Sequence, residues 1–188
     1  MDIAQIQQWL FYFFVFTMIG WVQESIIESL YHKKLINRGF LKGPYIPIYG
    51  FGGCLMLLVC KPFSFNGFLV FLVGMVSCTI LEFCTGMIME KVFNKQFWDY
   101  SMFKLTIKNR ISLVVSLFWG LLSLFMVYVL DNLISSFYAW VNPVAIWAYI
   151  GVMTVLMTVD FIVSARKNYR EKLAAQKAGE ANSSVKVS

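Results

Sequence analysis

The sequence predicts an all-α integral membrane protein with five transmembrane helices, an N-terminus outside the cell and a cytoplasmic C-terminus. Of its 188 residues, 59% are hydrophobic and only 14% are charged. Its mean hydropathy is +0.68, which lies outside the usual balance of a soluble domain. Five long stretches contain no Asp, Glu, Lys or Arg, and about 20 apolar residues are enough for a helix to cross the hydrocarbon core.

The uncharged stretches and their flanking residues place the individual helices. Asn142 is a suitable helix cap and Pro143 suits a first helical position, so the fifth helix is predicted to begin there. Pro44 and Pro47 disfavour a helix before them, so the second helix is predicted to be short and to begin near Pro47. We expect a transmembrane domain of residues 1–165, with spans at about 5–31, 46–60, 66–90, 110–130 and 143–163.

The orientation follows from the 16 Lys and Arg residues. All of them except Lys61 fall in the first loop, the third loop or the tail, which five spans place on one side of the membrane. Basic residues favour the cytoplasmic side, so these segments are predicted to be cytoplasmic. Membrane topology thereby explains the formal net charge of +6, and we expect membrane lipids rather than nucleic acid as partners. The basic tail, residues 166–188, is predicted to start as a helix and to end in disorder over its last dozen residues.

Cysteine and histidine usage argues against a metal centre. His32 is the only histidine, which excludes a multi-histidine site, and we expect neither a metal nor a cofactor. The cysteines lie inside or at the edge of apolar stretches and form no C-x-x-C pair, so we expect them to serve packing. They are Cys54, Cys60, Cys78 and Cys84.

Small residues predict where helices approach one another closely. Gly50, Gly52 and Gly53 begin the second span, and small residues recur at four-residue spacing on the third and fourth spans. The latter are Gly74 and Cys78, and Ser112, Ser116 and Gly120.

Carboxylates inside the spans are the strongest functional signal, because a buried charge in a membrane is costly and tends to face a partner, a cavity or a pathway. Glu24 and Glu82 precede Lys33 and Lys91 by the same spacing, which places both carboxylates about 13 Å inward of those lysines along the helix axis. Three further acids lie nearer the cytoplasmic ends of the spans and are secondary candidates. They are Glu28, Glu90 and Asp160.

Two arginines are the nearest predicted partners of these acids. Arg38 and Arg110 each follow an asparagine at the cytoplasmic entrance to an even-numbered span, where a guanidinium can bind a carboxylate or a phosphate. The order of span, acid, lysine, loop, Asn-Arg and span therefore occurs twice. Either a duplicated helix pair or coincidence explains this similarity.

The remaining candidates lie in the cytoplasmic loops. Tyr45 and Tyr49 are held near the inner mouth by the surrounding prolines, and the third loop contributes Asp99 and Tyr100. Two interpretations of the third loop stay open: a polar pocket shared with the arginines, or an aromatic and basic segment that anchors the protein at the headgroups. No catalytic residue is predicted. The predicted substrate or ion path consists of Glu24, Arg38, Tyr45, Tyr49, Glu82, Asp99, Tyr100 and Arg110.

Several blocks of sequence resemble a known family. The blocks are GWVQE at 20–24, NRGFLKGPYIPIYGFG at 37–52, LEFCTGMIMEKVF with FWDYS within 81–101, and NRISLVVSLFWG at 109–120. They resemble the small bacterial membrane proteins called putative ABC-transporter permeases of type IV. The resemblance covers roughly Trp9 to Leu130. The chain departs from the family pattern at Lys42, Ile46 and Lys108-Asn109-Arg110, where the family often has Asn, Cys and Asn-Gly-Arg.

The resemblance implies a multi-pass permease subunit of an ABC-type transporter in the bacterial plasma membrane, with an undefined substrate. The chain contains no G-x-x-x-x-G-K-[ST] phosphate loop, so any nucleotide hydrolysis requires a separate ATPase subunit. Five spans are few for a complete pathway, which is consistent with a homodimer. Two alternatives remain: a structural or regulatory membrane protein whose charges only fix helix packing, and an enzyme that modifies lipid headgroups at the cytoplasmic face.

Overall fold

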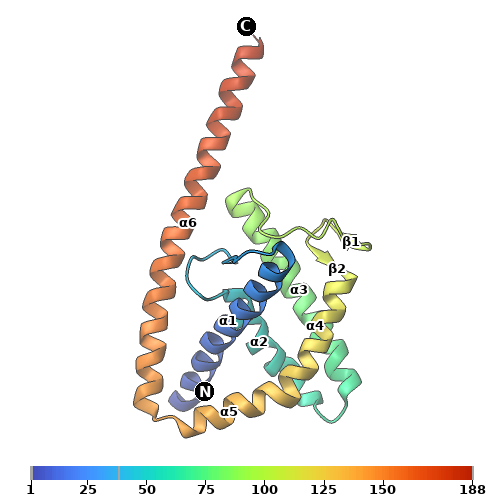
Figure 1. Ribbon diagram of the computed structural model, residues 1–188, viewed down its shortest axis with the longest axis vertical. Helices are drawn as coiled ribbons and strands as arrows, with labels where there is room; N and C mark the ends of the chain where they lie inside the picture. Colours follow the sequence, from blue (N-terminus) through green and yellow to red (C-terminus); the bar gives the residue numbers. More distant parts are fainter. Residues whose placement is uncertain (1, 38, 188) are drawn as a thin grey trace.

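The computed structural model describes residues 2–37 and 39–187, with side chains as far as Lys177. It consists of helices and one short antiparallel ribbon of β1 (Thr106–Ile107) and β2 (Ile111–Ser112) (Figure 1). A 3₁₀ turn, η1 (Lys61–Phe63), follows α2, and a π-helical turn, η2 (Met126–Leu130), joins α4 to α5. The helices are α1 (Ile3–His32), α2 (Pro47–Cys60), α3 (Gly67–Phe93), α4 (Leu113–Phe125), α5 (Asp131–Trp140) and α6 (Pro143–Val187). The predicted all-α class is confirmed.

Four helices are long and apolar enough to cross a membrane: α1, α3, the continuous helix Leu113–Trp140 and α6. The helix α2 is also apolar but has only 14 residues. Its length of about 21 Å is less than the roughly 30 Å of the hydrocarbon core. The structure therefore has four long candidate spans, and the second apolar helix is short, as predicted.

The predicted helix starts are confirmed at two prolines. The helix α2 begins at Pro47. The helix α6 begins at Pro143, and the backbone N–H of Val144 donates to Oδ1 of Asn142 at 2.8 Å. The backbone of α6 then stays helical as far as Val187, where the sequence predicted disorder over the last dozen residues. Side chains after Lys177 lie outside the described part of the chain.

The helix that contains the predicted fourth span continues beyond Leu130. The chain has no glycine or proline between Gly120 and Pro143, so nothing interrupts the helix, and it continues through η2 and α5 to Trp140. Figure 1 shows α5 turned away from α4 and running across the end of the bundle toward the start of α6. At its first residue, Asp131, a carboxylate that is almost fully buried accepts a hydrogen bond from Nζ of Lys61 at 2.8 Å.

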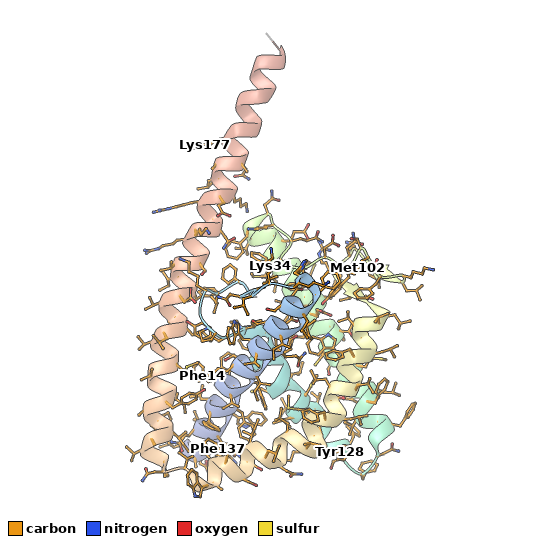
Figure 2. All side chains as sticks on the ribbon, in the orientation of Figure 1. Phe14, Lys34, Met102, Tyr128, Phe137 and Lys177 are labelled. Atoms are coloured by element: carbon orange, nitrogen blue, oxygen red, sulfur yellow. The ribbon has the colours of Figure 1, made fainter. Side chains whose placement is uncertain are left out.

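The segments rich in basic residues gather at one end of the bundle. The α1–α2 loop, the α3–α4 loop and the extension of α6 all lie there (Figure 1). Lys34 and Met102 mark this end in Figure 2, whereas Tyr128 and Phe137 lie at the other. We call these the basic end and the Lys61 end. The sequence grouped the same loops on one side of the membrane.

Glycines let α1 and α2 cross at close range. A Cβ atom on Gly20 would lie 2.1 Å from Cγ of Tyr49, and one on Gly53 would lie 2.4 Å from Cδ2 of Phe16. Gly50 is similarly crowded by α1 side chains. The predicted close approach at Gly50 and Gly53 is confirmed, and Gly20 supplies the complementary small residue on α1.

The helices α3 and α4 pack through small and hydroxyl side chains, as predicted. A Cβ atom on Gly74 would lie 2.2 Å from Cβ of Ser123, and the Ser123 hydroxyl donates to the carbonyl of Val70 at 3.0 Å. Thr79 Oγ1 donates to Oγ of Ser116 at 2.8 Å. These contacts hold α3 against α4, and the two helices carry Glu82 and Trp119 of the candidate site described below.

The carboxylate of Asp160 on α6 holds the loop between α1 and α2. Its Oδ2 atom accepts hydrogen bonds from the backbone N–H groups of Lys42 and Gly43 at 2.8 and 2.7 Å. Its Oδ1 atom accepts one from the hydroxyl of Ser164 at 3.1 Å. Asp160 therefore fastens the loop that leads into α2 onto α6.

Replacing Asp160 by Ala is expected to free this loop. Each hydrogen bond to a carboxylate contributes about 1.5–3 kcal/mol, so losing two should raise hydrogen exchange over residues 39–46 and lower the melting temperature. Hydrogen-exchange mass spectrometry checks this. Ser164→Ala is the matched control, because it removes only a side-chain donor to Asp160 and should leave the exchange of the loop unchanged. Equal exchange in wild type and the Asp160 variant would contradict the assignment.

The helix α6 also contacts the end of α3. The Lys172 ammonium group donates to the carbonyls of Lys91 and Val92, at 3.3 and 2.9 Å, where α3 ends. Lys95 forms an ion pair with Glu171 at 3.6 Å. The long helix α6 therefore bridges the α1–α2 loop and the end of α3 before it extends beyond the bundle (Figure 1).

Candidate functional site

Glu24 and Tyr49 form the first half of the candidate site. Glu24 lies one turn after Gly20 on α1, and Tyr49 lies in the first turn of α2. The Tyr49 hydroxyl donates to Oε1 of Glu24 at 2.5 Å. The missing side chain at Gly20 gives the Tyr49 ring the room to reach this position.

Glu82 forms the second half. It lies on α3 and is only 4% exposed. Oε1 accepts a hydrogen bond from the hydroxyl of Tyr100 at 2.6 Å, and Oε2 accepts one from Nε1 of Trp119 at 3.1 Å. Tyr100 comes from the α3–α4 loop and Trp119 from α4, so three segments converge on one carboxylate. Among the described residues, no Lys or Arg side chain forms an ion pair with Glu82.

The two halves touch each other. The rings of Tyr49 and Trp119 have centroids 5.6 Å apart. The carboxylates of Glu24 and Glu82 are close enough to interact electrostatically, and so are Tyr49 and Tyr100. We call Glu24, Tyr49, Glu82, Tyr100 and Trp119 the acid–aromatic cluster. Four helices and one loop thus place two carboxylates and three aromatic donors together inside the bundle.

Arg110 lies beside this cluster but binds another acid. Its Nε atom donates to Oε2 of Glu90 at 2.9 Å, and Nη2 also contacts that oxygen. The indole of Trp98 donates to the Arg110 carbonyl at 3.0 Å and lies over Gly86, where a Cβ atom would be 3.0 Å from the ring. Glu82, Gly86 and Glu90 follow one another at four-residue spacing on α3, and Arg110 binds at the Glu90 end of this row.

Two other predicted residues, Asp99 and Glu28, have partners outside the cluster. Asp99 is exposed and accepts hydrogen bonds from the backbone and hydroxyl of Ser101 at 2.9 and 3.0 Å. Glu28 lies 3.3 Å from the imidazole of His32 at the end of α1. Arg38 lies outside the described residues.

Tyr45 belongs to the contact between the α1–α2 loop and α6. Its hydroxyl donates to the carbonyl of Leu156 at 3.3 Å. Burial raises the pKa of the Tyr45 phenol above its ordinary value, and the nearby Asp160 carboxylate raises it further. Tyr45 therefore stays a neutral donor at physiological pH, and the structure links it with Asp160 rather than with the cluster.

A family comparison covers most of this arrangement. The family model described as "Putative ABC-transporter type IV" matches residues 11–165. The chain belongs to this family. Comparison with curated proteins gave no match, and comparison with solved structures gave none either. As a type IV family chain it is a multi-pass membrane protein, and the matched region contains the whole acid–aromatic cluster and Asp160.

Two features of this type IV family chain escaped the sequence reasoning. Trp119 was not among the candidates, although it lies one turn after Ser116 on the small-residue face of α4 and could have been found from that spacing. The Lys61–Asp131 ion pair was not predicted either. The cysteines are free thiols, and Cys60 and Cys78 are buried in packing positions, as predicted.

A small pocket adjoins the cluster. It has a volume of about 60 Å³ and lies between α1, α2 and the α4–η2 helix. Tyr49 and Trp119 line one part of it, and Met126 and Leu130 line another. Within the described residues, no three His, Cys, Asp or Glu side chains come together as metal ligands. The acid–aromatic cluster offers hydrogen bonds and carboxylate groups, and the pocket beside it has mostly apolar walls.

Exchanging the charges of Glu90 and Arg110 tests whether this pair serves packing. Arg110→Glu alone should lower thermal stability, because it places two carboxylates side by side with the side chain at position 110 only 14% exposed. Glu90→Arg combined with Arg110→Glu should restore much of the loss, since the pair is reformed. Thermal unfolding in detergent measures both effects. A double variant as unstable as the sum of the two single variants would argue against a direct pair.

Proposed function

We propose that this chain is the permease subunit of an ABC-type transporter and that its transport path passes the acid–aromatic cluster. The buried carboxylate of Glu82, held by Tyr100 and Trp119, carries the proposal. Such a group is costly inside a membrane, and in membrane proteins it commonly marks a path for substrates or ions. Family membership supports the same class of function.

The orientation is part of the proposal. The gathering of the basic loops at one end of the bundle supports a cytoplasmic basic end and a Lys61 end that faces outward, in a bacterial plasma membrane. Energy then comes from a separate ATPase that binds at the basic end, where α6 extends beyond the bundle. A second copy of the chain would complete the path, because the pocket beside the cluster has a volume of only about 60 Å³.

Purification from native membranes tests this proposal. A tagged chain, extracted in mild detergent after brief crosslinking, should carry an ATPase at a fixed ratio, and mass spectrometry identifies it by its phosphate-loop motif. The complex should hydrolyse ATP. Persistent purification of the chain without any ATPase, with the crosslinker active on a known complex in the same membranes, would count against the proposed function.

A further inference from the structure

The Lys61 end carries a second buried acid. Asp131 is 5% exposed and pairs with Lys61, whose own side chain is 63% exposed. The other carboxylate oxygen of Asp131, Oδ1, is buried and has no hydrogen-bond partner among the described residues. Asp131 directly follows the π-helical turn η2, and such turns occur frequently at functional sites. A buried oxygen without a partner is a costly feature that packing alone does not require.

The pocket is lined by residues that bind or adjoin the acids of both regions. At one end it is lined by Tyr49 and Trp119 of the cluster, and at the other by Leu130, which precedes Asp131. Phe16, also in the lining, contacts the ring of Tyr12 with centroids 5.8 Å apart. Tyr12 in turn lies close enough to Asp131 for an electrostatic interaction. Along α1, the distance from Glu24 to Tyr12 is about 18 Å, which is more than half of the roughly 30 Å thickness of the hydrocarbon core.

The chemistry of this passage favours a cation with apolar surface. Its walls are aromatic and aliphatic, with Gln23 as a neutral polar side chain. Two lining residues, Tyr49 and Trp119, bind carboxylates, and Leu130 precedes Asp131. In a medium of low dielectric constant, carboxylates attract cations and repel anions strongly. Aromatic faces add to the attraction for an organic cation. Lys61 is the cation paired with Asp131, and its exposed side chain can move away into solvent.

Building on the proposed function, we propose that the pocket is the middle of a route for small organic cations. The contact between Tyr49 and Trp119 closes the route at the cluster, and the Lys61–Asp131 ion pair closes it at the other end. Lys61 occupies the position that the positive group of the solute takes when it reaches Asp131. Glu82 attracts the same group at the cluster.

Cysteine labelling tests the route without knowledge of the natural substrate. Met56 lines the pocket and is 1% exposed, so Met56→Cys is the reporter, in a chain whose four native cysteines are replaced by Ala. The purified chain is placed in lipid nanodiscs, so that reagents reach both faces of the bilayer. It then reacts with two methanethiosulfonate reagents, one that carries a trimethylammonium group and one that carries a sulfonate group, and the rate of each reaction is measured. Phe65→Cys, at an exposed position, gives the reference ratio of the two rates.

The expected result is a cation-to-anion rate ratio at Met56→Cys about tenfold above the reference, since attraction by one unpaired charge corresponds to a factor of this order. Lys61→Ala should raise the cationic rate several-fold by removing the closing ion pair. Asp131→Asn and Glu82→Gln should each lower the ratio toward the reference. Leu122→Cys, which also lines the pocket, serves as a second reporter if the first variant does not fold.

Equal ratios at Met56→Cys and Phe65→Cys, or no reaction at either pocket reporter in any variant, would overturn the route. The experiment uses the chain without its ATPase. Failure of labelling together with a copurifying ATPase would remove the route and its solute class but leave the proposed function. Cation-selective labelling of a chain that never copurifies with an ATPase would support the route but count against the proposed function.

Discussion

Glu82→Gln is expected to abolish ATP-driven transport while the chain remains folded and inserted. The change removes the buried negative charge but keeps the shape of the side chain. The amide oxygen can still accept from one of the two donors, Tyr100 and Trp119, and leaving the other unpaired costs about 1–3 kcal/mol. That cost lowers the melting temperature without unfolding the bundle. The loss of charge at a point where a transported group must bind affects function far more.

Transport can be measured without a known substrate. Membrane vesicles of both orientations are given ATP in a cell extract, and untargeted mass spectrometry detects the solutes that they accumulate. The wild-type chain should change this set of solutes, and Glu82→Gln should resemble vesicles that lack the chain. Asp2→Asn is the matched control, because that carboxylate is exposed at the start of α1, away from the basic end, and asparagine also caps a helix. Full transport by the Glu82 variant would remove the cluster from the path.

Gly20→Ala is expected to destabilise the protein strongly. The new methyl group would lie 2.1 Å from Cγ of Tyr49, at the base of a ring that cannot turn away without moving α2. Overpacking of this kind typically costs about 1–3 kcal/mol. Because Tyr49 would be displaced from Glu24, the cluster should also lose its tyrosine hydrogen bond.

The matched control is Gly151→Ala on α6. No atom lies within 4 Å of the Cβ position there, so the change should be neutral or stabilising, since Ala exceeds Gly in helix propensity by up to about 1 kcal/mol. Thermal unfolding in detergent compares the two variants. If both shift the melting temperature equally, the close contact of α1 and α2 at Gly20 is not a determinant of stability.

Local chemistry made much of the fold predictable. Prolines fixed the starts of α2 and α6, and glycines indicated close helix contacts, because these residues act through their own backbone geometry. The similar depth of Glu24 and Glu82 followed from helix rise alone, and the structure brings the two acids together. The length of the helix from Leu113 to Trp140 was missed because a change of sequence polarity at Asp131 does not by itself end a helix.

The partners of the acids depended on tertiary structure. Arg110 reaches Glu90 because the β1–β2 ribbon turns at Lys108 and Asn109, which have φ angles of 51° and 56°. Asn is one of the residues that adopt such left-handed positions in hairpin turns most readily, and it stands at the second of them. Trp119 reaches Glu82 only because α3 and α4 pack at Gly74 and Ser123. Spacing could have placed Trp119 on the packed face of α4, but it does not identify Glu82 or Glu90 as the acid that each partner reaches.

The most direct measurement of a transport path through the pocket is its accessibility from each side during the ATPase cycle. The complex with its ATPase, carrying Met56→Cys, is reconstituted in vesicles and labelled with an impermeant thiol reagent supplied inside or outside. Met56 should react from one side without nucleotide and from the opposite side after trapping with ATP and vanadate. Unchanged labelling in the two states, or none from either side, would contradict a path past the acid–aromatic cluster.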